Sequence, residues 1–579
     1  MKNILKWIKW QAMLIIAFIM MAGPQNMMAQ ESTVTGKVTD NSGKPLPGVN
    51  IIVKNTTTGV STGVNGTYSI SVPEPNSVLV FQFIGYTTVE EPLSGRSVID
   101  VILREQVTSL DEVVVTALGI RRERKALGYS VAEVGSEEIL NAQESNVITA
   151  LSGKIAGVQI NTSSSQAGGA ARITIRGHSS LLYNNQPLFI VDGIPFDNSE
   201  SGNRDGGPGT STGIDLDPAN IETISVLKGA AASALYGSRA ANGVILVTTR
   251  SGKMNSTPTV KISHKSTFTS IYETPLQETW AMGLYNSTSG EYEYYDTDLG
   301  QYTSSSWGPR IDDLVEAGVA EKFDRWKYFK TGYTAESNFS VSGGSDKISY
   351  FAAINSSNQS GVLDPIKLGR TSFTTNLTAH VTDKITATVG LNYVQTNNDR
   401  LIEGWSSLSS FMNTFLSSPW TWNPEPIFDE NGRQRIYRWA GRNNYLWIQE
   451  NTNNNVQRNR FKPVFSLNYD ILPGLSLSGK AGIDFYSQTQ KFYVNVGSIA
   501  YGSTTGSFSQ STEEYISFNS DVMLNYKRDF LGGDLKTDFM AGHNIQTYQS
   551  LSSGIDGADY NIPGWYNIYN CSTQTPWSN

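Results

Sequence analysis

The chain has 579 residues, of which 39% are hydrophobic, 11% aromatic and only 17% charged, so it is neither disordered nor a bundle of membrane helices. A formal net charge of −8 offers no cationic surface for phosphate groups, and we expect no DNA or RNA partner. The single cysteine, Cys571, excludes an intrachain disulfide framework and multi-cysteine metal sites. The length and the 53 glycines favour several mainly β domains with many turns.

Residues 1–29 have the pattern of a secretory signal peptide. Three lysines in the first nine residues are followed by eleven apolar residues from Ala12 to Ala22. A spanning helix needs about twenty apolar residues, so an N-terminal membrane anchor is the weaker alternative. The small residue Ala29 marks the cleavage edge, and we expect the mature protein to start at Gln30.

Residues 30–105 alternate short apolar runs with turn residues, which predicts a small β-sandwich of at most seven strands. The order G-x-V-x-D-x-x-G-x-P-L-x-G-V from Gly36 to Val49, followed by Gly66–Tyr68, resembles the carboxypeptidase-regulatory-like domain. Val64-Asn65 replaces an acidic residue that is usual there, which argues against a bound cation. The resemblance implies a fold, and catalysis does not follow from it.

Gly59–Gly63 matches the nucleophile-elbow pattern G-x-S-x-G, which would make Ser61 the nucleophile of a hydrolase. An elbow needs a strand that leads into a helix, whereas this stretch has hairpin character. We therefore reject the hydrolase and expect no enzymatic activity.

Residues 106–125 form a linker that contains the β-prone segment Asp111-Glu112-Val113-Val114-Val115. Taken alone, such a segment is most simply a buried edge strand. Its functional interpretation is an exposed strand to which a partner adds its own strand, main chain to main chain.

Residues 126–252 mix short helices and strands, with a helix from Ser136 and a strand at Leu188–Val191 that ends in the turn Asp192-Gly193. Four motifs in order, Leu151–Val158, Ile175–Gly177, Val191–Pro195 and Lys228–Ile245, resemble the plug domain of the SusC/RagA family of TonB-linked outer-membrane receptors.

By that resemblance, Asp111–Val115 is similar to the TonB box, the segment pulled by the energised inner-membrane partner TonB. The motif residues of the plug are Arg176, Gly177, Asp192, Gly193, Lys228, Gly229, Tyr236, Gly237, Arg239, Asn242 and Gly243. We expect the glycines to relieve backbone crowding. We expect Arg176, Lys228 and Arg239 to pack on the barrel wall, through carboxylates, in preference to substrate contact.

The glycine-rich run Gly202–Gly213 lacks the G-K-[ST] ending of a phosphate-binding loop, so we interpret it as a mobile loop. Asp205, Asp215 and Asp217 lie in or beside it at irregular spacing. We expect these acids to face water, and we predict no metal site and no cofactor.

Residues 253–579 change to strands of about ten residues with dyad alternation, the signature of a transmembrane β-barrel, with a soluble β-sandwich array as the alternative. Hairpins are predicted around Gly344–Asp346, Thr382–Lys384, Pro473-Gly474 and Gly532-Gly533. About ten or eleven strands are too few, because plugged transporters close at about 22. We expect an incomplete barrel, the N-terminal part of a longer protein, and the ending Pro576–Asn579 shows no amphipathic final strand.

The long connections Tyr272–Glu336 and Leu401–Asn459 are expected on the extracellular side. The second holds five tryptophans whose flat faces suit sugar or peptide capture, although interface anchoring or packing on the plug explains them equally well: Trp405, Trp420, Trp422, Trp439 and Trp447.

The resemblance implies active import across the bacterial outer membrane, with TonB and a SusD-like surface lipoprotein as partners and lipid around the barrel. An oligosaccharide is the expected substrate. The alternatives are a peptide importer of the same family and a non-transporting surface β-protein or adhesin.

Overall fold

The computed structural model divides the chain into two compact units, Met1–Glu112 and Val113–Asn579. It describes residues 32–104, 113–115, 121–123 and 131–579, apart from gaps at 55, 57, 84–85, 143, 163–165, 182–183, 202–208, 230–232, 234–235, 273–274, 287–290, 294, 297–300, 303–305, 319, 403–409, 438–441, 501–503 and 531–534. The predicted signal peptide, Asp111 and Glu112 lie outside the described residues. Strands dominate the rest, which confirms the mainly β fold.

The first unit is a sandwich of two sheets with the strand orders β4-β1-β7 and β3-β2-β5-β6. Its strands are β1 (Ser32–Thr39), β2 (Asn50–Val53), β3 (Gly59–Ser61), β4 (Thr67–Val72), β5 (Val78–Gln82), β6 (Val89–Pro92) and β7 (Val101–Ile102). Alternate residues of β4, namely Tyr68, Ile70 and Val72, enter the apolar core. The seven strands confirm the predicted β-sandwich.

Ser61 ends β3, an edge strand that pairs with β2 and leads through a turn to β4. A nucleophile elbow requires a helix directly after its strand. The fold therefore gives Ser61 no elbow.

Gly36 and Tyr68 both lie close to the backbone of Ile99 and show how densely the core of the sandwich is packed. A Cβ on Gly36 would lie 1.8 Å from the carbonyl oxygen of Ile99, so only glycine fits there. The Tyr68 hydroxyl donates a 2.9 Å hydrogen bond to the same oxygen, and its ring packs edge-on against Phe81. Burial raises the pKa of the Tyr68 phenol to about 12.

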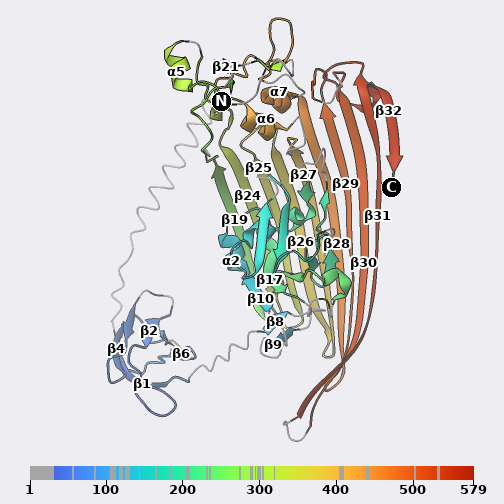
Figure 1. The fold of residues 1–579 in the computed structure, drawn as a ribbon. Helices are drawn as coiled ribbons and strands as arrows, with labels where there is room; N and C mark the ends of the chain where they lie inside the picture. The colour runs from blue at the N-terminus through green and yellow to red at the C-terminus, as the bar shows by residue number, and fades with distance from the viewer. Residues whose placement is uncertain are drawn as a thin grey trace, which may run out of the picture. The chain divides into compact units, whose positions relative to one another are not determined.

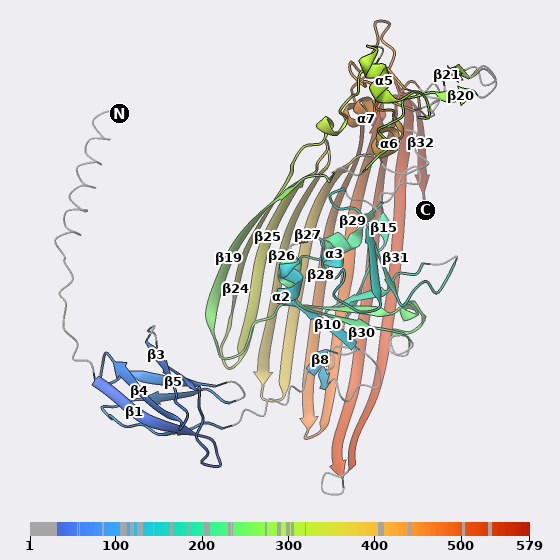
Figure 2. The same cartoon turned by 60° about the vertical axis from the view of Figure 1, so that its left-hand side comes forward.

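The second unit begins with a two-stranded hairpin. Strand β8 (Val113–Val115) pairs antiparallel with β9 (Arg121–Glu123), and the two form a sheet of their own. Both views place the hairpin on the side of the plug that faces away from α6 and α7 (Figures 1 and 2).

The plug is built on a five-stranded sheet with the order β10-β17-β18-β13-β14. Its elements are β10 (Val131–Gly135), α2 (Ser136–Asn141), α3 (Val147–Ala150), β11 (Val158–Thr162), β12 (Ala171–Ile175), β13 (Leu188–Val191), β14 (Ile194–Phe196), β15 (Glu200–Ser201), β16 (Thr210–Ser211), η3 (Thr212–Asp215), η4 (Pro218–Asn220), β17 (Ile221–Leu227), η5 (Ser238–Ala240) and β18 (Val244–Thr249). The predicted helix from Ser136 and strand Leu188–Val191 are both present.

Ten antiparallel strands form one curved sheet, called the wall below, and the plug lies against its concave face (Figures 1 and 2). They are β19 (Ser256–Thr269), β24 (Gly332–Gly344), β25 (Ile348–Ser360), β26 (Lys367–Thr382), β27 (Ile385–Arg400), β28 (Thr452–Leu472), β29 (Leu475–Val494), β30 (Ser507–Phe530), β31 (Leu535–Tyr560) and β32 (Cys571–Ser578). Three of the predicted turns fall between consecutive strands, and Gly532-Gly533 lies outside the described residues between β30 and β31.

The wall strands reach 26 residues, well beyond the predicted ten. β24 starts at Gly332 and β28 at Thr452, so both long connections end earlier than the sequence predicts. The reason is that the first residues of β28 are polar on both faces, as in Asn453–Asn455, and lack the apolar alternation that marks a lipid-facing strand. The final residues also form a strand, β32, paired with β31.

The two connections carry their own short elements. These are β20 (Leu284–Asn286), β21 (Glu291–Glu293), β22 (Tyr295–Asp296), β23 (Gln301–Tyr302), α5 (Ile311–Glu316) and η6 (Trp326–Tyr328) in the first, and α6 (Phe411–Ser417) and α7 (Tyr445–Asn451) in the second; η8 (Ile568–Asn570) precedes β32. Together they gather at the end of the wall opposite the tight turns (Figure 2).

The wall has apolar residues on its outer face and polar residues on its inner face, the opposite of a sheet in a soluble protein. On β26, Phe373, Leu377 and Val381 are exposed on the outer face, whereas Arg370 and Ser372 on the inner face are buried against the plug. An outer apolar face with a polar interior is the arrangement of a barrel in lipid. Among the described residues, no helix is both long and apolar enough to cross a membrane.

Loss of the Tyr68 hydroxyl should change how the first unit responds to pH. The pKa of the phenol is 10.0 in an unfolded chain and about 12 in the folded domain. Its contribution to the free energy of unfolding is therefore complete below pH 10 and is lost as the pH rises through 12. In urea titrations of residues 30–105, we expect the free energy of unfolding to fall between pH 10 and 12, and to fall less in Tyr68→Phe. At neutral pH, Tyr68→Phe should cost about 1–3 kcal/mol, because the buried Ile99 carbonyl loses this donor. Parallel pH curves for both proteins would refute the assignment.

Candidate functional site

The Asp192-Gly193 turn of the plug points at the wall. Asp192 has φ +54° and Gly193 has φ +86°, the left-handed geometry of a tight turn between β13 and β14. A Cβ on Gly193 would lie 2.5 Å from the Lys480 amine, so the glycine lets the wall side chain approach. The Asp-Gly turn that the sequence predicts is therefore a contact point between the plug and the wall.

Two lysines on neighbouring wall strands hold this turn, an arrangement we call the lysine clamp. The Lys462 amine on β28 donates to the Val191 carbonyl at 3.1 Å and lies 3.4 Å from the Asp192 carboxylate. Lys480 on β29 donates to the Asp192 carbonyl at 3.1 Å. The other carboxylate oxygen of Asp192 accepts from the Thr249 backbone amide at 2.9 Å. Asp192 thus links the turn, β18 and the wall.

A second group of buried charges lies around Asp215, at the end of η3. Its carboxylate is 3.2 Å from Arg458 and 3.3 Å from Arg460, both on β28. Arg460 also forms a two-pronged pair with Asp484 on β29, and its guanidinium lies 3.4 Å from the centre of the Phe196 ring. The side chains of Arg458, Arg460, Asp215 and Asp484 are at most 1% exposed.

Asp217 makes the third contact between the plug and the wall. It caps η4 by accepting from the Ala219 amide, accepts from Ser372 at 2.9 Å and lies 3.7 Å from Arg370. The expectation that Asp215 and Asp217 face water is wrong: each is buried against a wall arginine. Asp205 lies outside the described residues. Within the described ranges, no three His, Cys, Asp or Glu side chains gather as a metal site would require.

The other motif residues have mixed surroundings. Lys228 donates to the Ala156 carbonyl inside the plug, and Arg176 is exposed with φ +59°. Arg239 reaches the wall, where its guanidinium lies 5.7 Å from the ring centre of Tyr548. Asn242 donates to the Asn184 carbonyl.

The motif glycines share one feature, a left-handed backbone. Those with positive φ are Gly177, Gly193, Gly229, Gly237 and Gly243. This geometry supplies the physical reason for glycine at these positions.

The connections pack into a separate core above the plug. Arg325 donates to the carbonyls of Phe415 and Ser418 at the end of α6, and its guanidinium lies 4.4 Å from the Trp420 ring centre. A cation at a helix C-terminus satisfies carbonyls that the helix leaves unpaired. Arg325 therefore ties the first connection to the second.

The tryptophans are part of this core. Trp420 is 6% and Trp447 1% exposed, and Trp422 packs against Tyr437 and Tyr445. Trp405 and Trp439 lie outside the described residues. A role in substrate capture stays a prediction for all five, and for Trp420 and Trp447 it would require the core to open.

The arginine and lysine residues on the inner face of the wall were not identified from the sequence. Arg458, Arg460 and Lys462 recur at every second position, which places all three on one face of a strand. That alternation was the available signal, but Arg458 fell inside the predicted connection Leu401–Asn459. Asp484 and Lys480 carried no local signal.

The geometry defines a class of protein: a plug held by polar contacts inside a wall whose outer face is apolar. The family model for the TonB-dependent receptor plug domain matches residues 123–244, and the model for the CarboxypepD_reg-like domain matches residues 34–115. Over 351 residues the chain is 34% identical to the TonB-dependent receptor SusC of Bacteroides thetaiotaomicron, covering 60% of this chain and 32% of that protein. It is 26% identical to the TonB-dependent receptor P39 of Formosa agariphila, covering 94% of this chain and 49% of that protein.

Solved structures of the same fold include the RagAB peptide importer in its open-open state. The match has a TM-score of 0.61 at 21% identity and covers 81% of this chain and 53% of that one. Together, the two domain matches and the similarity to SusC and RagAB support a receptor of the SusC/RagA family of TonB-dependent receptors. The chain spans about a third of the length of SusC and about half of the length of P39.

Neutralising Asp215 should loosen the plug. Asp215→Asn leaves Arg458 and Arg460 buried with less compensating charge, a change that costs about 3–5 kcal/mol when a buried pair is broken. We expect a lower denaturant midpoint for release of the plug, measured by the fluorescence of a dye on an engineered plug cysteine. Glu200→Gln, which breaks the more exposed pair with Arg172, should cost only about 0–1 kcal/mol. Equal midpoints for the two variants would contradict this.

Removing the Arg325 guanidinium should loosen α6. Arg325→Ala deprives the Phe415 and Ser418 carbonyls of their donor, and we expect faster amide hydrogen exchange in residues 411–418. Lys327→Ala removes a neighbouring exposed lysine and should leave that exchange unchanged.

Proposed function

We propose that the protein imports a nutrient across the bacterial outer membrane, driven by TonB, and that this import is transport without chemical change of the solute. The observation that carries the proposal is the polar contact between plug and wall. Buried ion pairs contribute little net stability relative to their hydrated partners. A plug held in this way has one defined position against the wall, yet it can leave that position when water replaces its contacts with the wall.

TonB would act on the segment Asp111–Val115. In the described part of this segment, β8 pairs with β9 along one edge, and the two-stranded sheet leaves the other edge of β8 without a strand partner. A free edge offers backbone donors and acceptors to an added strand. Force on β8 would pass to the plug, which follows it directly in the chain.

An oligosaccharide is the substrate class we propose, delivered with the help of a SusD-like surface lipoprotein. The support is the resemblance of the plug motifs to the SusC/RagA family, for which an oligosaccharide is the expected substrate. A peptide is the second candidate, because a matching structure is that of a peptide importer.

Breaking the β8 strand should stop uptake. Val114→Pro removes a backbone N–H and disfavours strand pairing, so we expect uptake of labelled oligosaccharide by whole cells to fall at least about tenfold. Val114→Ile preserves the strand and should transport normally. Surface binding at equilibrium should be the same in both variants.

Two results would overturn the proposal. Undiminished uptake by Val114→Pro would exclude this segment as the coupling strand. Binding without uptake in the unsubstituted receptor would instead support a non-transporting surface protein or adhesin.

A further inference from the structure

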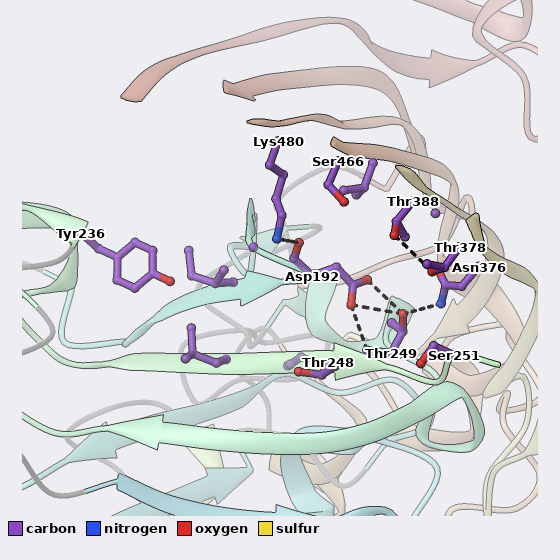
Figure 3. Close-up of a pocket in the computed structure, with 16 residues that line it drawn as sticks. Asp192, Tyr236, Thr248, Thr249, Ser251, Asn376, Thr378, Thr388, Ser466 and Lys480 are labelled. Atoms are coloured by element: carbon purple, nitrogen blue, oxygen red, sulfur yellow. Dashed lines mark hydrogen bonds between the residues drawn. The ribbon is translucent and has the colours of Figure 1, made fainter. Parts of the chain in front are cut away.

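A cavity of about 290 Å³ lies between the plug and the wall, next to the lysine clamp (Figure 3). Along the inner face of β28 the side chains shorten from Arg460 and Lys462 to Val464 and Ser466. The long side chains fill the interface, and the short ones leave space. The cavity therefore lies on the side of the clamp nearer the tight turn after Leu472.

On the side of the ten-stranded wall, the cavity is lined by a row of small side chains that carry hydroxyl groups. Thr378, Thr388 and Ser466 are consecutive cross-strand partners on β26, β27 and β28, and the next partner in the row is Lys480. Thr378 and Thr388 share a 3.1 Å hydrogen bond. Gly390, in the neighbouring row, adds no side chain. The cavity thus exists because the residues of this row on β26, β27 and β28 have small side chains, up to Lys480 on β29.

The opposite side belongs to the plug and is partly apolar. Ile190 and Leu246 are buried members of one cluster on the plug sheet, and both line the cavity. Thr248 adds a hydroxyl on the plug side, and Ser251 adds another near Asn376 (Figure 3). Among the described residues, the hydroxyls of Ser466, Thr248 and Ser251 form no hydrogen bond, so they have capacity for a ligand.

We propose that this cavity is a transit site that holds one sugar ring of the imported oligosaccharide at a time, an inference that rests on the proposed import function. A pyranose ring has an apolar C–H face and hydroxyls at its rim, which match the apolar plug side and the hydroxyl row. Ligand pockets measure about 300–1,000 Å³, so this cavity, at the lower end of that range, suits a single ring of the chain at one time. Because tight turns of outer-membrane barrels face the periplasm, the site lies on the exit side of the clamp.

Cysteine protection tests occupancy directly. In the purified full-length receptor, Cys571 is replaced by Ser, and Ser466→Cys is labelled with a small methanethiosulfonate. We expect glucose at about four times its Kd to slow labelling about fivefold, and triglycine to have no effect. Ser340→Cys, an inward-facing position on β24 outside the cavity, should label at one rate throughout. Absence of protection by glucose, or protection by triglycine alone, would overturn the proposal.

Filling the cavity tests its part in transport. Ser466→Leu removes a hydroxyl without a partner in the described chain and inserts a larger side chain. We expect oligosaccharide uptake to fall at least about tenfold with surface binding retained, whereas Ser340→Leu should transport normally. Normal uptake by Ser466→Leu would overturn the transit site and leave the import function intact. If the unsubstituted receptor shows no uptake, the import function fails, and glucose protection alone decides whether the cavity binds a sugar.

Discussion

The alternation of the wall strands is the constraint on which the rest of the structure depends. Each strand gives one face to the outside and the other to the plug, so an apolar outer face leaves polar residues on the inner face. An inner face of Arg, Lys, Ser and Thr cannot be covered by an apolar plug without unpaired polar groups. The plug therefore meets the wall with Asp192, Asp215 and Asp217.

The arrangement of these charges fixes where the plug sits. Asp215 lies between two arginines on one strand, and lysines on two strands hold the turn at Asp192. A shift of the plug by one residue along the wall would separate the buried Asp215 pairs and break the contacts of this turn. Breaking such a pair costs more than forming it contributes, since the remaining charge stays buried. The contacts therefore specify one position of the plug more strongly than they stabilise it.

Local features were predictable from the sequence, and distant pairings were not. The Asp192-Gly193 turn and the hairpin turn Thr382–Lys384 each depend on residues within a few positions, and both are present. The partner of Asp215 is 243 residues away, and nothing near Asp215 encodes it. An acidic residue beside a glycine-rich run is expected to lie in a solvent-exposed loop. Only the arginines on the inner face of β28 explain why Asp215 is buried. The burial of Trp447 was hidden for the same reason, because its hydrophobic cluster draws residues from both long connections and from the wall.

Strand β28 combines two physical roles through a single change in side-chain size. Its inner face carries Arg458, Arg460 and Lys462 where the plug is held, then Val464 and Ser466 where space remains. The packing between the plug and β28 is interrupted at the cavity, which Val464 and Ser466 line. The order of residues along this one strand thus sets both where the plug is fixed and where space remains between the plug and the wall.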